Sequence, residues 1–184
     1  MLHLKFREPG PFCVAPRRTT DGAVENINRK FIENIMAIQA PDLTKQPPRS
    51  ARARLGGYAL LPRMLDKGRA TINGKNGEYH YNCPLDQRFV QFVGIDAEAL
   101  KKELEAGKGD GEILEWINAN AKQKHTEAAI KAWSDFQENR APNDTESREY
   151  FNNLHKQIAP KREDIWSWAD LLDLDDYVSF GGKA

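Results

Sequence analysis

The chain has 184 residues, a length that fits one ordinary domain. Its 27 basic and 27 acidic residues cancel, so it lacks the strong net charge typical of a disordered chain. Two cysteines, Cys13 and Cys83, are too few for a disulfide scaffold, which favours a reducing compartment. The first residues carry charges where a signal peptide has its apolar core, and no stretch reaches the ~20 apolar residues that span a bilayer. We therefore expect a cytoplasmic protein without membrane contact.

Residues 1–20 contain three prolines and few periodic apolar positions, which predicts an irregular N-terminal arm. The remainder, residues 21–184, is predicted to form a single helical domain. Its first helix is indicated by apolar residues spaced three or four apart, which form one stripe along a 3.6-residue period. These residues are Val24, Ile27, Phe31, Ile35 and Ile38. Pro41 ends this helix.

The next helix is predicted to begin at Pro62, because proline suits the first turn of a helix. Gly68 lies on its apolar face and would allow another helix to approach closely. Asn73-Gly74 and Asn76-Gly77 are strong turn signals, so one short β-hairpin near residues 70–82 is the candidate for strand structure.

From Pro84 onward the sequence predicts one helix after another. Asp96, Asp110 and Thr126 are expected to cap the starts of three of them. In the helix after Thr126, the residues expected to face inward are Ile130, Trp133 and Phe136. We predict an all-α fold, an irregular bundle of about seven helices.

Several short blocks run in order through the middle of the chain. They are Leu55–Gly57, Arg63–Lys67, Gly74–Lys75, Asp86–Phe89 and Asp110–Trp116. Together they resemble a bacterial family known as domain of unknown function 5069. The resemblance covers roughly residues 48–121, which would form a family-like core, with residues 122–184 as a helical C-terminal extension. It implies a soluble bacterial protein, but no particular activity, cofactor or catalytic residue.

Charge is unevenly distributed along the chain. Between Lys45 and Lys75, eight basic residues accompany a single acidic residue, Asp66. Within this basic segment we select Arg63, Asp66, Lys67 and Arg69 as candidate ligand-binding residues, because arginine forks bind anions through paired hydrogen bonds. The alternative is that this segment folds against the acidic segments at residues 96–120 and 170–176.

A second candidate site surrounds Cys83. Pro84 in a first helical turn places Cys83 at or near the N-cap, where free backbone N–H groups and the helix dipole favour a thiolate. His80 is then a candidate base, and Asp86 a nearby acid, so the candidate catalytic residues are Cys83, His80 and Asp86. The simpler alternative is a half-buried cysteine at a turn.

The same three residues could also contribute metal ligands, with a fourth from His125 or His155. Structural zinc sites show paired ligands in both halves of the site, whereas only one half is visible here. We therefore predict no metal site.

Two functions remain open. The first is a binding or interaction module for an anionic small molecule or an acidic protein surface, contacted by the basic segment. The second is a small enzyme in which Cys83 is the nucleophile and His80 the base. We favour the first because more residues support it. Nucleic acid is disfavoured as a partner because no known binding module is evident, and the sequence identifies no cofactor.

Overall fold

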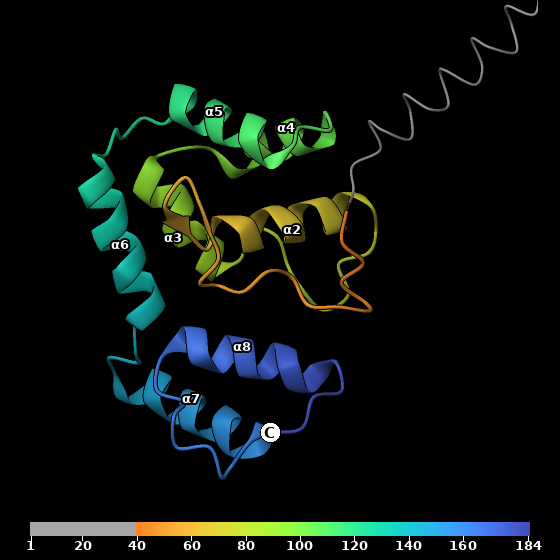
Figure 1. Ribbon diagram of the computed structural model, residues 1–184, viewed down its shortest axis with the longest axis vertical. Helices are drawn as coiled ribbons and strands as arrows, with labels where there is room; N and C mark the ends of the chain where they lie inside the picture. The colour runs from red at the N-terminus through yellow and green to blue at the C-terminus, as the bar shows by residue number, and fades with distance from the viewer. Residues whose placement is uncertain (1–39) are drawn as a thin grey trace, which may run out of the picture. The chain divides into compact units, whose positions relative to one another are not determined.

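The computed structural model describes residues 40–184, which hold seven helices and one two-stranded hairpin (Figure 1). The helices are α2 (Leu61–Ile72), α3 (Pro84–Val93), α4 (Ala97–Glu105), α5 (Asp110–Asn120), α6 (Glu127–Asn139), α7 (Thr145–Ile158) and α8 (Trp168–Ser179). The predicted all-α fold of about seven helices is confirmed. The N-terminal arm and the first predicted helix lie outside the described residues. No helix within residues 40–184 is long and apolar enough to cross a membrane.

The hairpin pairs β1 (Arg54–Leu55) with β2 (Tyr58–Ala59) in antiparallel register. Its turn requires positive φ angles at both central positions, and Gly56 and Gly57 supply them at 57° and 85°. The prediction of a hairpin near residues 70–82 was wrong in position. That stretch completes the last turn of α2 and then continues through turns without strand pairing.

Helices α4 and α6 begin as the sequence predicts. Asp96 and Thr126 are their N-caps, and each side chain accepts a hydrogen bond from a backbone N–H in the first turn. Helix α5 differs by one residue, because Gly109 is its N-cap and Asp110 its first residue. The Glu112 side chain accepts the hydrogen bond of the Gly109 N–H, which leaves the Asp110 carboxylate available for other partners.

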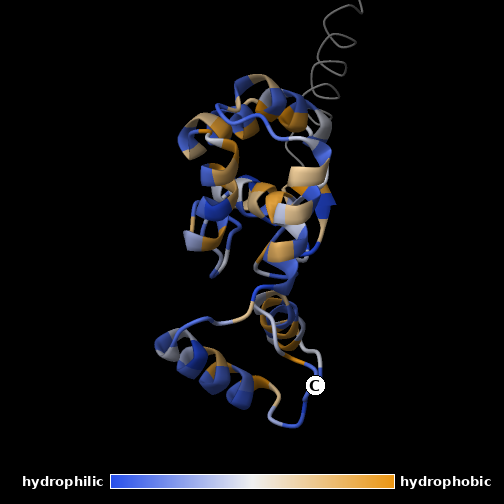
Figure 2. Ribbon diagram, turned by 90° about the vertical axis from the view of Figure 1, so that its left-hand side faces the viewer, coloured by the Kyte–Doolittle hydropathy of each residue, from blue (hydrophilic) through white to orange (hydrophobic). Residues whose placement is uncertain are grey.

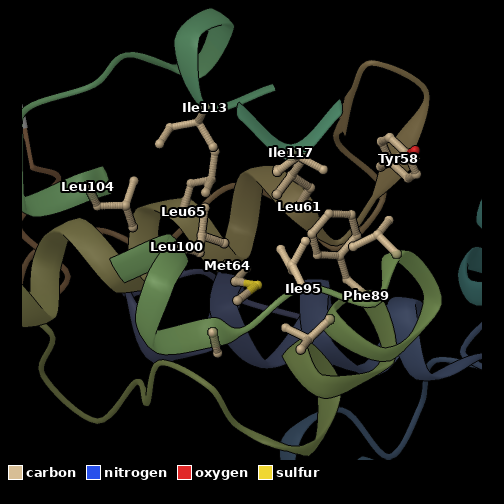
Figure 3. Packing of buried hydrophobic residues seen from close by; sticks show 13 residues of the cluster. Tyr58, Leu61, Met64, Leu65, Phe89, Ile95, Leu100, Leu104, Ile113 and Ile117 are labelled. Atoms are coloured by element: carbon tan, nitrogen blue, oxygen red, sulfur yellow. The ribbon is translucent and has the colours of Figure 1, made fainter. Parts of the chain in front are cut away.

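The core forms around α2, as the close view in Figure 3 shows. On α2, Leu61, Met64 and Leu65 are fully buried, and Ile113 and Ile117 of α5 lie against the same side. Removing one such side chain from water contributes about 1.5–3 kcal/mol. The helices also carry hydrophilic residues, as Figure 2 shows, and in α2 even these are buried, because all residues from Leu61 to Ala70 are removed from solvent.

Gly68 brings α2 close to α4. A Cβ atom at this position would lie 2.6 Å from Leu104 Cδ1 and 3.1 Å from the ring of Tyr81. Leu104 is itself fully buried, so it has little room to move. The close helix approach predicted at Gly68 is therefore confirmed.

Two of the three α6 residues expected to face inward do so. Ile130 and Trp133 pack against the core, but Phe136 is 59% exposed. Buried Ser134 takes its place, because the hairpin presents backbone groups that need a polar partner. The Ser134 hydroxyl accepts a hydrogen bond from the Ala59 N–H at 3.0 Å and donates one to the Gly57 carbonyl at 2.8 Å.

Replacing Gly68 with Ala should destabilise the protein by ~1–3 kcal/mol, because the added methyl group overfills the contact between α2 and α4. Gly111→Ala is the matched control, since Gly111 also lies in a helix but has open space around its Cβ position. That change should stabilise the protein by up to ~1 kcal/mol through helix propensity. Urea unfolding measures the free energy of unfolding of both variants. If Gly68→Ala gained as much stability as Gly111→Ala, the close packing at Gly68 would be contradicted.

Candidate functional site

The four residues selected as an anion-binding cluster are all buried in α2. Arg63, Asp66, Lys67 and Arg69 each keep less than a tenth of their surface exposed. A buried charge is costly unless it is paired and hydrogen-bonded. The partners of these four side chains therefore determine what the cluster can do.

Arg63 pairs with Asp176 of α8 through both arms of its guanidinium group. The two nitrogens lie 2.5 and 3.2 Å from the carboxylate oxygens. Tyr79 covers this pair, because its hydroxyl donates to Asp176 at 2.7 Å and its ring lies under the Arg63 guanidinium. Burial raises the pKa of the Tyr79 hydroxyl, and the hydrogen bond to Asp176 raises it further.

Asp66 and Arg69 join a second network, which ties α2 to α5. Arg49 forms a bidentate pair with Asp66, with N–O distances of 2.8 and 2.9 Å. The Asp110 carboxylate then bridges two arginines, with Arg49 and Arg69 each 2.6 Å away. Burial by itself would raise the pKa of Asp110, but the hydrogen bonds from these two arginines outweigh it and lower the pKa.

The same pattern extends to the rest of the basic segment. Arg52 bonds Asp170 and Asp173 of α8, and Arg54 bonds two acids of α6. Arg52 and Arg63 thus contact the acidic segment at residues 170–176, and Arg49 and Arg69 contact the one at residues 96–120, which is the alternative that the sequence left open. The partners of Arg54 lie outside both acidic segments. An anion site at Arg63, Lys67 and Arg69 stays a prediction, but the chain's own carboxylates occupy the two arginines.

Lys67 connects the two candidate sites that the sequence treated separately. Its ammonium group donates to Asp86 Oδ1 at 2.7 Å and to the sulfur of Cys83 at 3.2 Å. The side chains of Lys67 and Asp86 are only 4% and 1% exposed, whereas Cys83 is half-buried. We call these three residues the thiol cluster.

The start of α3 places Cys83 where its sulfur can meet Lys67. Cys83 is the N-cap and Pro84 the first helical residue, as predicted. The Cys83 side chain makes no capping hydrogen bond, so the sulfur remains available to Lys67. Just before it, Asn82 has a φ of 61°, a left-handed backbone that costs a non-glycine residue free energy.

Asp86 lies in the first turn of α3 and contributes the buried charge that holds Lys67. Burial raises the pKa of its carboxyl group, and the adjacent Lys67 ammonium offsets that effect only in part. Its second oxygen, Oδ2, makes no well-aligned hydrogen bond among the described residues, although the backbone N–H groups of Asn82 and Cys83 also act on the carboxylate and lower its pKa.

His80, the predicted base, lies exposed on the turn before α3, and no hydrogen bond joins it to Cys83 within residues 40–184. The structure therefore brings together Cys83 and Asp86 but not His80. Sequence reasoning missed Lys67 as the contact of Cys83. The sequence did hold a sign that Lys67 is buried. Lys67 lies three residues after Met64, so helical spacing places it next to the apolar face formed by Leu61, Met64 and Leu65.

No three metal-ligating side chains gather closely enough to hold an ion in the part of the chain that the structure describes. His125 stacks on the ring of Phe92, and His155 packs beside Phe151. Neither histidine joins the thiol cluster.

Fold and site define a helical domain whose central helix carries buried, paired charges and contacts a half-buried thiol. The family model described as domain of unknown function (DUF5069) matches residues 45–178, most of the chain. The chain belongs to this family. The match extends beyond residues 48–121 and includes α6, α7 and nearly all of α8. A comparison with curated proteins gives no match.

Replacing Arg63 with Gln should destabilise the protein by about 3–5 kcal/mol, because Asp176 would keep a buried charge without its partner. Arg162→Gln is the matched control, since Arg162 and Asp164 form an exposed pair on the surface. That change should leave the unfolding midpoint almost unaltered. Chemical denaturation of both variants makes the comparison.

Adding inorganic phosphate to the same samples tests the anion site. The ion pairs described above predict that phosphate raises the melting temperature of the unaltered protein no more than that of Arg63→Gln, because only the general salt effect acts on both. A rise that increases with phosphate concentration and disappears in Arg63→Gln would instead support an anion site.

Asp110 should make stability depend on pH in the acidic range. Its pKa in the folded chain lies below the ordinary value of 3.8, so its contribution is fully present above that value. The contribution is lost as the pH falls below 3.8 through the lowered pKa. Asp110→Asn should thus be less stable than the unaltered protein at pH 7, and the gap should shrink in acid. A gap that stays constant in urea titrations would contradict the Arg49–Asp110–Arg69 bridge.

Proposed function

We propose that this protein acts through the thiol of Cys83, which serves as a nucleophile supported by Lys67 and Asp86. One observation carries the proposal: the Lys67 ammonium contacts both the Cys83 sulfur and the Asp86 carboxylate. Of the two functions that the sequence left open, this develops the second, with Lys67 in the position proposed for His80.

The chemistry of the cluster supports a nucleophilic role. The thiolate is the reactive form of cysteine, and positive charge and helix N-termini both favour it. A hydrogen bond from an ammonium group is stronger when the acceptor carries charge, so Lys67 interacts better with a thiolate than with a thiol. Asp86 holds the lysine in place from its buried position in α3. Lys67 is thus a positioning residue, and Cys83 is the group that would touch the substrate.

A surface groove lies beside Cys83. Cys83 is half-buried and does not itself line the groove, but the residues on either side of it, Asn82 and Pro84, do, and the groove measures about 490 Å³. Gln87, Arg88 and Gln91 of α3 complete the groove. Amide and guanidinium groups donate hydrogen bonds, so the groove suits a polar substrate with acceptor oxygens.

Iodoacetamide labelling followed by peptide mapping tests the reactivity of the thiol. We expect Cys83 to react faster than Cys13 in the same chain, and Lys67→Gln to slow labelling of Cys83 roughly tenfold. Lys161→Gln, at an exposed lysine, should have no effect. Slow labelling of Cys83 in the unaltered protein would remove the basis of the proposed function.

A second variant separates a chemical role for Lys67 from a purely structural one. Asp86→Asn keeps the lysine, and the amide oxygen of Asn can still accept the hydrogen bond that holds the ammonium group beside the sulfur, so Cys83 should stay about as reactive as in the unaltered protein. Circular dichroism establishes that each variant is folded before labelling. If Lys67→Gln and Asp86→Asn slow labelling equally, the lysine acts only through the fold.

A further inference from the structure

The contact between Lys67 and Cys83 places a primary amine directly against a thiol. Nζ lies 3.2 Å from Sγ, and the lysine is held there by a buried ion pair with Asp86. Such a pair can do more than tune nucleophilicity, because an oxidised cysteine sulfur is itself an electrophile that reacts with nitrogen.

We propose that oxidation by a hydroperoxide joins Cys83 and Lys67 through a covalent sulfur–nitrogen bond, a reversible sulfenamide that links α3 to α2. This inference rests on the proposed reactivity of the Cys83 thiol. It adds a modification site and a class of reactant, a peroxide, to the thiol cluster.

The first step converts the thiolate into a sulfenic acid. The sulfur attacks one peroxide oxygen, the O–O bond breaks, and hydroxide leaves, so the sulfur is oxidised by two electrons and the peroxide reduced. In the second step the neutral Lys67 amine attacks the sulfur of the sulfenic acid. The new S–N bond forms as the S–O bond breaks, and the departing oxygen leaves as water.

Asp86 completes the proton balance of the second step. The Lys67 ammonium must lose two protons in all, one before it attacks and one after. One proton leaves with the departing oxygen as water, and the other stays on the Asp86 carboxyl group. The raised pKa of buried Asp86 fits this role, and its Oδ1 already accepts a hydrogen bond from the Lys67 ammonium at 2.7 Å. The buried ion pair thereby becomes a neutral acid beside a neutral sulfenamide.

The local sequence also directs the reaction to Lys67. A sulfenic acid can condense with the backbone nitrogen of the following residue, but here that residue is Pro84, which has no N–H. Cys83 is the only cysteine within residues 40–184, so no second thiol of this part of the chain competes. The lysine amine is the nitrogen in contact with the sulfur.

Mass spectrometry of the full-length chain tests the inference in a Cys13→Ser background, which removes the alternative of a disulfide within the chain. After hydrogen peroxide treatment, we expect a product lighter by two hydrogen atoms. Tryptic mapping should join the peptides that hold Lys67 and Cys83, with no cleavage after Lys67. A thiol reductant should restore the original mass.

Two lysine variants complete the design. Lys67→Arg keeps a cation at the sulfur but removes the nucleophilic amine, so the lighter product should disappear while Cys83 still oxidises. Lys75→Arg changes a lysine in the turn after α2, and this variant should give the same cross-linked product as the Cys13→Ser protein with both lysines unaltered. A product that persists in Lys67→Arg would overturn the assignment to Lys67.

The remaining outcomes separate this inference from the proposed function. If peroxide gives only sulfenic or sulfinic acid at Cys83, the thiol is reactive but the cross-link is refuted. If Cys83 reacts with neither peroxide nor iodoacetamide, both the cross-link and the proposed function fail.

Discussion

The buried charges of α2 constrain the elements packed around this helix, because each charge must find an opposite charge on another element. Four ionisable side chains lie within seven residues of α2, and all are removed from solvent. Leaving one of them unpaired would cost several kcal/mol, a large share of the stability of a domain. Their partners come from α3, α5, α8 and the segment before β1. Apolar contacts hold these elements together, and the ion pairs restrict which face of α2 each one meets.

This constraint also accounts for the site. The Lys67 ammonium forms a buried ion pair with Asp86, which lies in the first turn of α3. Cys83 is the N-cap of the same turn, so it lies beside this pair. The contact with Asp86 that neutralises the buried charge of Lys67 thus also places the Lys67 amine next to the Cys83 thiol. At this position the structural ion pair also forms the contact between amine and thiol on which the proposed function rests. Arg63 and Arg69 share the burial of Lys67 but donate hydrogen bonds only to oxygen atoms, whereas Lys67 also donates one to sulfur.

Local features of the fold could be predicted from the sequence, whereas pairings between distant residues could not. Pro84, Asp96 and Thr126 mark helix starts because the cause, a missing N–H or a capping oxygen, lies within one turn. The prediction that Phe136 faces inward was wrong. Apolar spacing does not show that backbone groups of the hairpin need hydrogen bonds with the Ser134 hydroxyl, which takes the inward position. Likewise, charge segregation indicated that acids and bases meet but not which ones. The contact between Lys67 and Cys83 depends on how two helices pack, so it appeared only in the structure.

A double-mutant cycle on Lys67 and Asp86 tests most directly whether buried ion pairs govern this fold. The single variants Lys67→Met and Asp86→Leu each leave one buried charge unpaired, whereas the double variant leaves none. The account predicts a loss of about 3–5 kcal/mol in each single variant and a much smaller loss in the double variant. Losses in the double variant equal to the sum of the two singles would show that the charges are not coupled, and would contradict the account.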